Sequence, residues 1–185
     1  MDEVRAAFDA VPREGFLPRR ARSQAGFDGP ITIGHGQTNS QPRTVEAMLR
    51  LLQVRTGDRI LDVGAGSGWT TALLAQLTGP DGSVIGVELV PELAAWGAEN
   101  LSRTTYGWAS IQPAREGVLG EPRTSPYDRI LVSAEARTLP QELVSQLTDH
   151  GRIVVPVRST MTLGVRRGSD LDVSEHGSYR FVPLL

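Results

Sequence analysis

The sequence predicts an α/β fold with a doubly wound, mostly parallel sheet, and three observations support this prediction. Apolar runs of strand length alternate with segments of helical periodicity along most of the chain. The first apolar run, residues 59–63, leads directly into a turn with glycine at every second position and then into a helical segment. The second run, residues 83–87, ends at an acidic residue, Glu88. Such a chain is expected to gather its loops at one edge of the sheet.

The elements ahead of the sheet are predicted to be two helices and a loop. Apolar residues recur at helical spacing over residues 2–10 and predict a short amphipathic helix, which Pro12 ends. Residues 26–42 are rich in Gly, Thr, Asn, Gln and Pro and show little periodicity, so they predict a long ordered loop. An amphipathic pattern then predicts a helix over residues 45–52.

The remaining chain predicts the sheet and its covering helices. In order, the expected elements are strand 59–63, helix 69–77, strand 83–88, helix 91–101, strand 109–112, strand 128–133, helix 140–147 and strand 151–157. Turns are expected at residues 79–82 and 149–151. Residues 161–165 and 179–182 are expected to form two more strands that pair as an antiparallel edge.

Length and composition restrict the classes of protein. At 185 residues the chain fits one domain over residues 1–185, with residues 1–57 ahead of a core over residues 58–185. The absence of cysteine excludes disulfides and thiolate metal sites, and the three histidines are too scattered to suggest a metal site. The net charge of -2 gives no general attraction to nucleic acid, and no apolar run has transmembrane length. We expect a cytoplasmic monomer with no metal, no membrane span and no nucleic-acid partner.

Four arginines, Arg13, Arg19, Arg20 and Arg22, form a local exception to this charge balance. A solvated surface is the simpler interpretation of such a cluster. The alternative is a site that receives an anionic substrate. The sequence leaves both interpretations open.

The glycine turn indicates a class of ligand. Gly64, Gly66 and Gly68 let the backbone turn tightly and approach a ligand, and the helix that follows presents unpaired N–H groups. Asp62 would repel a pyrophosphate but suits the ammonium of an amino-acid moiety, and Glu88 can accept both ribose hydroxyls. This pattern favours S-adenosylmethionine over NAD. The alternative is a tight strand-to-helix turn that Asp62 braces.

With these features in place, the chain resembles the protein-L-isoaspartate (D-aspartate) O-methyltransferases. The most specific match is the loop Gly-Gln-Thr-Asn-Ser-Gln-Pro at residues 36–42, because the glycine turn is shared by most class I methyltransferases. Further matches cover nearly the whole chain and lie at residues 10–16, 33–36, 125–130, 154–157 and 180–184. The resemblance implies a Rossmann-like class I methyltransferase fold. It also implies repair of damaged proteins or peptides by methyl transfer from S-adenosylmethionine to the carboxylate of L-isoaspartyl residues, with S-adenosylhomocysteine as the product.

The resemblance also assigns functions to individual residues. Ser40 matches the serine usually treated as catalytic, whose hydroxyl would orient the acceptor carboxylate. The residues implied to bind the cofactor are Gln37, Thr38, Asn39, Asp62, Gly64, Gly66, Gly68, Glu88, Leu89, Glu116 and Gly117.

Two positions depart from the pattern of the family. Family members usually have Gly-Asp-Gly after the third strand, where this chain has Arg115, Glu116 and Gly117. Glu116 would take the place of the aspartate beside the adenine amino group, and the added cation is expected to alter adenine affinity. After the fourth strand the family has two small residues, whereas this chain has Ala134 and Glu135. If Glu135 faces the acceptor, it would repel an isoaspartyl carboxylate and weaken isoaspartyl turnover.

Simpler interpretations stay open at this point. Ser40 would also suit the N-cap of the helix that starts near Pro42, His35 would suit a loop or packing position, and Glu116 a solvated loop. For the whole chain, one alternative is a carboxyl methyltransferase of the same family that acts on an aspartyl residue of a specific peptide. Another is an S-adenosylmethionine-binding module without catalysis.

Overall fold

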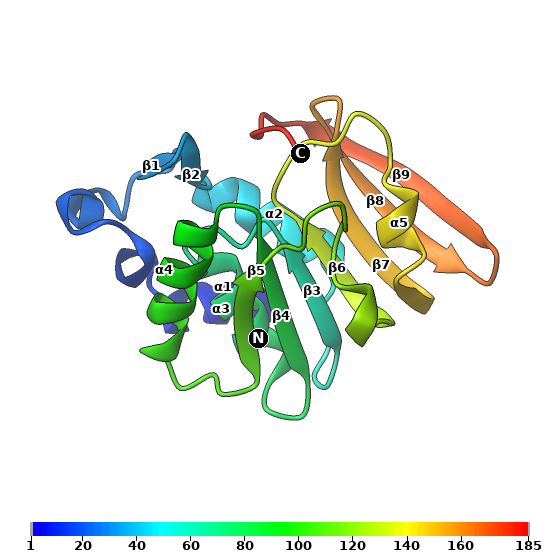
Figure 1. Ribbon diagram of the computed structural model, residues 1–185, viewed down its shortest axis with the longest axis horizontal. Helices are drawn as coiled ribbons and strands as arrows, with labels where there is room; N and C mark the ends of the chain where they lie inside the picture. The colour runs from blue at the N-terminus through cyan, green and yellow to red at the C-terminus, as the bar shows by residue number, and fades with distance from the viewer. Residues whose placement is uncertain (1, 185) are drawn as a thin grey trace.

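The computed structural model describes residues 2–184 and contains a seven-stranded sheet (Figure 1). Its strands are β3 (Arg59–Val63), β4 (Ser83–Glu88), β5 (Ala109–Pro113), β6 (Tyr127–Val132), β7 (Leu147–Val157), β8 (Thr160–Arg167) and β9 (Asp170–Ser178). The strand order is β5-β4-β3-β6-β7-β8-β9. The first five in this order pair in parallel, and β8 and β9 add an antiparallel edge. The predicted α/β fold with its antiparallel edge is confirmed.

Helices and loops bury both faces of this sheet. The helices are α1 (Glu3–Ala10), α2 (Pro42–Leu52), α3 (Trp69–Thr78), α4 (Pro91–Ser102) and α5 (Gln141–Val144), with 3-10 helices η1 (Arg13–Phe16), η2 (Arg19–Gln24) and η3 (Pro122–Thr124). Helices α1 to α4 share one apolar cluster with strand residues such as Leu131 and Val154. Their neighbours Ile130 and Ile153 belong to a second cluster with α5. Because successive side chains of a strand point to opposite faces, these central strands are apolar on both sides.

The segment predicted as a long loop, residues 26–42, contains a separate antiparallel hairpin. Its strands are β1 (Ile31–Gly34) and β2 (Gln37–Asn39), which pair with each other and not with the main sheet. Residues 34–36 close the hairpin, and all three have positive φ. Ile33 is buried beneath it. Strands of four and three residues are too short to give a recognisable alternation, so the sequence did not predict them.

Two predicted boundaries near the C-terminal half are wrong. The helix expected over residues 140–147 is limited to α5, because β7 already begins at Leu147. The turn expected at residues 149–151 lies inside β7 as an irregularity in pairing. Tyr127 pairs with Leu147, whereas Arg129 pairs with Arg152, and His150 has a φ of 62°. The excess residues on β7 loop out of the ladder and carry the turn-like sequence.

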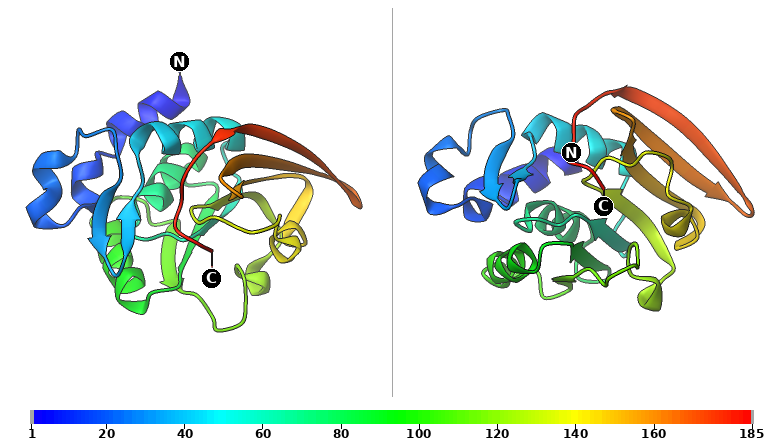
Figure 2. Two further views of the ribbon diagram at one scale, coloured as in Figure 1. Left: turned by 90° about the horizontal axis from the view of Figure 1, so that it is seen from above. Right: turned by 45° about the horizontal axis from the view of Figure 1, so that its top comes forward.

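The last predicted strand is also displaced. The second edge strand is β9, and residues 179–182 instead leave it and return across the sheet (Figure 2). The backbone N–H of Glu135 donates to the carbonyl of Val182 at 2.7 Å, and the N–H of Leu184 donates to the carbonyl of Glu135 at 2.8 Å. The C-terminal segment therefore lies beside the loop that follows β6. None of the helices in residues 2–184 has the length and apolarity needed to cross a membrane.

The contact between α4 and the glycine turn leads to a first prediction. A Cβ atom on Gly97 would lie 2.6 Å from the carbonyl oxygen of Gly66. Since backbone cannot move aside cheaply, Gly97→Ala should lower the free energy of unfolding by about 1–3 kcal/mol, despite the better helix propensity of alanine. Gly107→Ala is the control, because nothing lies within 4 Å of its Cβ position. Urea denaturation measures both variants, and equal stability would contradict the close contact.

Candidate active site

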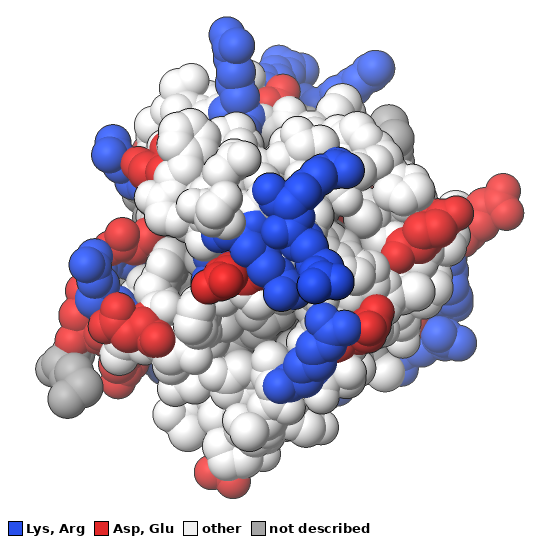
Figure 3. Space-filling model, turned by 90° about the vertical axis from the view of Figure 1, so that its left-hand side faces the viewer, with Lys and Arg blue, Asp and Glu red and all other residues white. Residues whose placement is uncertain are grey.

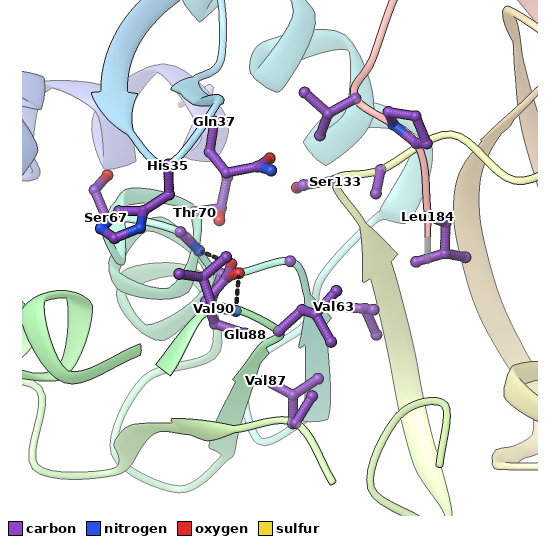
Figure 4. Close-up of a pocket in the computed structure, with 18 of the residues that line it drawn as sticks. His35, Gln37, Val63, Ser67, Thr70, Val87, Glu88, Val90, Ser133 and Leu184 are labelled. Carbon is purple, nitrogen blue, oxygen red and sulfur yellow. Dashed lines mark hydrogen bonds between the residues drawn. The ribbon is translucent and has the colours of Figure 1, made fainter. Parts of the chain in front are cut away.

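A cavity of about 740 Å³ lies at the carboxyl ends of β3, β4 and β6. The hairpin forms one wall, and residues 182–184 form the opposite wall. Figure 4 shows Gln37 projecting from the hairpin into the space between Glu88 and Ser133. Ligands of open α/β sheets bind outside the carboxyl ends of the strands. The position of the cavity is therefore the one expected for the ligand site.

Most of the predicted site residues line this cavity. They are Gln37, Thr38, Asn39, Ser40, Gly64, Gly66, Glu88, Leu89, Glu116 and Gly117. Four segments that are distant in the sequence contribute them, so the fold brings them together. Gly68 and Asp62 do not line the cavity. Gly68 is the N-cap of α3, where a Cβ atom would lie 2.9 Å from the carbonyl oxygen of Gly97.

The glycine turn has the backbone geometry that glycine permits. Gly64, Gly66 and Gly68 have φ values of 82°, 52° and 88°. The N–H groups of Gly64 and Ala65 both donate to the carbonyl of Val87, at 2.9 and 3.1 Å. A Cβ atom on Gly66 would lie 3.4 Å from Cδ1 of Ile33 in the hairpin. The turn is thus fixed to the end of β4 below and covered by the hairpin above.

Glu88 is held at the wall of the cavity by two backbone groups. Its Oε2 accepts from the N–H of Gly66 at 2.8 Å and its Oε1 from the N–H of Val90 at 3.0 Å (Figure 4). A carboxylate can accept about four hydrogen bonds, so each oxygen keeps a lone pair for a ligand. This arrangement suits two neighbouring hydroxyls such as those of a ribose.

Asp62 lies beneath the turn and is fully buried. Its Oδ2 accepts from the hydroxyls of Thr70 at 2.8 Å and Thr71 at 2.7 Å. Burial, followed by the charge of Glu88, raises the pKa of the Asp62 carboxyl to about 6 against the hydrogen bonds from both threonines. Asp62 thus braces the turn through Oδ2, whereas its buried Oδ1 has no hydrogen-bond partner among residues 2–184. Its direct contact with a cofactor ammonium stays a prediction.

The raised pKa predicts how stability changes with pH. A carboxyl whose folded-state pKa lies above its unfolded value stabilises the fold below the unfolded pKa and loses that stability as pH rises through the folded pKa. Wild type should therefore lose roughly 2–3 kcal/mol relative to Asp62→Asn between pH 4 and pH 7. Asparagine can still accept from both threonine hydroxyls through its single amide oxygen.

Urea denaturation of both proteins from pH 4 to pH 7 measures this difference. Asp81→Asn is the matched control, because Asp81 is exposed. It controls for the loss of one carboxyl group from the chain. A constant difference for Asp62→Asn would contradict the assignment.

The cation that replaces a small residue before Glu116 is neutralised inside the protein. Arg115 donates to Glu121 at 3.1 Å, and Glu121 also accepts from Gln112 and Arg123. The hydrogen bonds from Arg123, together with the charge of Arg115, hold the pKa of the Glu121 carboxyl down to about 2. Arg115 thus anchors the loop that carries Glu116 at the cavity, and the predicted effect of Arg115 on adenine affinity stays a prediction.

Ser40 lies in the cavity wall directly ahead of α2. The N-cap of α2 is Gln41, whose side chain makes no capping bond. The N-cap interpretation of Ser40 is therefore wrong. His35 is exposed in the hairpin turn at the rim of the same cavity.

Glu135 does not line the cavity. Its Oε2 accepts from the hydroxyl of Ser159 at 3.2 Å, while its backbone pairs with the C-terminal segment. The prediction that Glu135 faces the acceptor and repels its carboxylate is therefore wrong. The loop after β6 contributes Ser133 and Ala134 to the wall in its place.

The arginine cluster of the N-terminal segment divides into different environments. Arg19 and Arg20 are exposed, as a solvated surface requires. Arg13 is 5% exposed, so the interpretation as a solvated surface is wrong for this residue. Arg22 lines a second cavity of about 650 Å³ together with Arg103 at the end of α4. Figure 3 shows basic side chains gathered on this side of the molecule.

The cavity wall also contains residues that were not predicted from the sequence, among them Ser67, Ser133 and residues 182–184. The Oγ of Ser133 is buried and has no hydrogen-bond partner among residues 2–184. Ser133 is the last residue of a predicted parallel strand, and this position could have identified it as a site residue, because the carboxyl ends of parallel strands meet at the ligand site. The C-terminal segment matches the family pattern at residues 180–184 but has no residue pattern typical of a ligand site. Within the same described residues, no group of three side chains is suited to hold a metal.

The chain is similar to known proteins over its whole length. A model of the family described as protein-L-isoaspartate(D-aspartate) O-methyltransferase matches residues 1–185. A protein-L-isoaspartate O-methyltransferase of Methanopyrus kandleri is 42% identical over 189 residues, covering 100% of this chain and 84% of the relative.

Two solved structures are similar over the full length of the chain. One, a protein-L-isoaspartate O-methyltransferase, has a TM-score of 0.89 at 25% identity, and the chain spans 61% of that longer protein. The other is described as a protein-L-isoaspartate O-methyltransferase of Plasmodium falciparum in complex with S-adenosyl-L-homocysteine. It has a TM-score of 0.87 at 27% identity, and the chain covers 91% of it.

Proposed function

Because the chain belongs to the protein-L-isoaspartate(D-aspartate) O-methyltransferase family, we propose that its cavity binds S-adenosylmethionine along the glycine turn and an isoaspartyl carboxylate beside Ser40. The chain is an S-adenosylmethionine-dependent protein carboxyl methyltransferase that acts on L-isoaspartyl residues. The methyl ester can close to a succinimide, which reopens in part to normal aspartate, so the reaction serves protein repair.

One observation carries the assignment of roles. Ser40 and the glycine turn line the same cavity, although they come from different segments. A methyl donor and its acceptor must meet in one site that excludes water. The walls provided by the hairpin and by residues 182–184 meet this requirement, because they cover the carboxyl ends of the strands from two sides.

The residues at the turn fit the proposed cofactor. Glu88 would accept the ribose hydroxyls, and Leu89 and Glu116 would lie beside the adenine. Gly64 and Gly66 line the cavity without side chains, which allows close approach of the methionine moiety. When bound, S-adenosylmethionine supplies a methyl group activated by its sulfonium.

The acceptor requires orientation rather than activation. A carboxylate is already ionised at pH 7, so no general base is needed. The hydroxyl of Ser40 would donate one hydrogen bond to it and fix its rotation. The unpartnered hydroxyl of Ser133 is a second donor available at the opposite wall. His35 is exposed and has no role in this proposal.

An assay with labelled S-adenosylmethionine tests the proposed acceptor. Matched peptides that contain isoaspartate, aspartate or D-aspartate are compared for base-labile methyl incorporation. Labelling of the isoaspartyl peptide supports the proposal. Labelling confined to an aspartyl peptide favours a specialised carboxyl methyltransferase, and binding of the cofactor without any labelling favours a non-catalytic module.

The cytoplasmic compartment, the single domain and the monomeric state stay part of the proposal. Analytical ultracentrifugation tests the monomeric state.

Ser40→Ala tests the role of the hydroxyl. Methyl transfer should fall by about 5- to 150-fold, which corresponds to roughly 1–3 kcal/mol, while affinity for S-adenosylhomocysteine changes little. Steady-state kinetics and calorimetry measure the two quantities. Ser110→Ala, at an exposed position of β5, should leave both unchanged. An unchanged kcat for Ser40→Ala would remove the serine from the mechanism.

A further inference from the structure

Arg13 is a buried cation whose hydrogen bonds converge on the loop that carries Ser40. Its Nη2 donates to the carbonyls of Ser40 at 2.8 Å, Asn39 at 3.0 Å and Gly29 at 2.9 Å. Its Nη1 donates to the carbonyl of Phe27 at 2.8 Å. The guanidinium thus crosslinks both ends of the segment that contains the hairpin.

The Nε group of Arg13 makes a fifth bond, which extends the connection to the cofactor turn. It donates to Oδ1 of Asn39 at 2.6 Å, and Nδ2 of Asn39 donates to Oγ of Ser67 at 3.0 Å. Since a guanidinium can only donate, the orientation of the Asn39 amide is determined. Ser67 lies between Gly66 and Gly68 in the turn. A continuous chain of hydrogen bonds therefore links Arg13 to both the acceptor loop and the cofactor turn.

The surroundings of Arg13 require a guanidinium in particular. Among residues 2–184 no carboxylate forms an ion pair with it, so five oxygen acceptors solvate its charge, and the nearby charge of Asp28 favours its protonated form. The Cζ atom of Arg13 also lies 5.4 Å from the ring centroid of Trp69. Burial lowers the pKa of Arg13 to about 10, and the group stays protonated at neutral pH. A lysine would keep the charge but could not reach five acceptors in this planar arrangement.

We propose that Arg13 is a positioning residue for methyl transfer, which sets the acceptor loop relative to the cofactor turn through Asn39 and Ser67. This inference rests on the proposed roles of Ser40 and of the glycine turn. Arg13 itself does not line the cavity. Its effect is on the distance and angle between acceptor and donor, to which the rate of transfer is sensitive.

The first test measures Arg13→Lys at saturating peptide and S-adenosylmethionine. We expect kcat to fall roughly 10- to 100-fold, because a misplacement near 1 Å has effects of this size. The dissociation constant of S-adenosylhomocysteine, measured by calorimetry, should stay within about threefold of wild type, because Arg13 does not contact the cofactor cavity. Arg19→Lys, at an exposed arginine six residues away in η2, should leave both values unchanged.

Variants of Asn39 test the connection without altering Arg13. Asn39→Leu removes both bonds of the amide, whereas Asn39→Asp keeps the acceptor for Arg13 and replaces the amide donor, so that a bond to Ser67 persists only if the serine hydroxyl turns and donates. We expect kcat to fall in the order wild type, Asn39→Asp, Asn39→Leu. If Arg13→Lys does not fold, the two Asn39 variants test the positioning role of Arg13 instead. Equal kcat in the two Asn39 variants would overturn the role of the Arg13 bond.

Hydrogen exchange provides a measurement that does not depend on activity. The peptide that covers residues 31–41 should exchange faster in Arg13→Lys than in wild type and in Arg19→Lys. A kcat within twofold of wild type in folded Arg13→Lys, or a loss of cofactor affinity as large as the loss of kcat, would overturn the proposal. If wild type esterifies none of the peptides, the proposed function fails, and the exchange rates alone decide: unchanged exchange rejects the positioning role, and faster exchange retains it for whatever acceptor the loop holds.

Discussion

The arrangement of the cavity depends on one close contact between two stretches of backbone. At the junction of the glycine turn and α4, a Cβ atom on Gly97 would lie 2.6 Å from the carbonyl oxygen of Gly66, and one on Gly68 would lie 2.9 Å from the carbonyl oxygen of Gly97. Glycine on both sides is therefore required for the helix to lie this close. The contact sets the position of the turn, and with it the N–H group of Gly66 that donates to Glu88 and the hydroxyl of Ser67 that accepts from Asn39.

Hydrogen bonds from β4, the hairpin and α4 hold the glycine turn in place. The end of β4 holds it through the carbonyl of Val87, and Glu88 holds it through a side-chain carboxylate. The hairpin reaches it through the amide of Asn39, and α4 through Asn100, whose Nδ2 donates to the carbonyl of Ser67 at 3.0 Å. Polar side chains in this region thus satisfy backbone groups that a tight turn would otherwise leave unpaired.

The parts of the fold that the sequence predicted correctly are those encoded by neighbouring residues. Residues 59–63 and 83–88 form strands with the predicted bounds, because an apolar run between turn residues is a local pattern. The glycine turn was predicted for the same reason, and the acceptor loop was found through a specific resemblance rather than through periodicity. The direct role of Asp62 was predicted from its proximity in sequence, whereas its burial places it behind the turn.

Features that depend on distant partners could not be predicted in this way. Arg13 resembles Arg19 and Arg20 in sequence, and it differs from them because carbonyl groups 14 to 27 residues away surround it. Glu135 follows a strand near the site, yet its side chain is hydrogen-bonded to Ser159 and its backbone is hydrogen-bonded to the C-terminal segment. In both cases the environment of the side chain is decided by chain that arrives from elsewhere in the fold.

The separation of the β1–β2 hairpin from the main sheet has a consequence for turnover. Its strands pair with each other, so an opening movement of the hairpin would break no hydrogen bond of the seven-stranded sheet. Local openings of this kind require less free energy than global unfolding, and lids of enzyme sites are drawn from such regions. A bulky peptide product enclosed beneath the hairpin would leave when this element opens, which makes the stability of the hairpin a determinant of the residence time of the product.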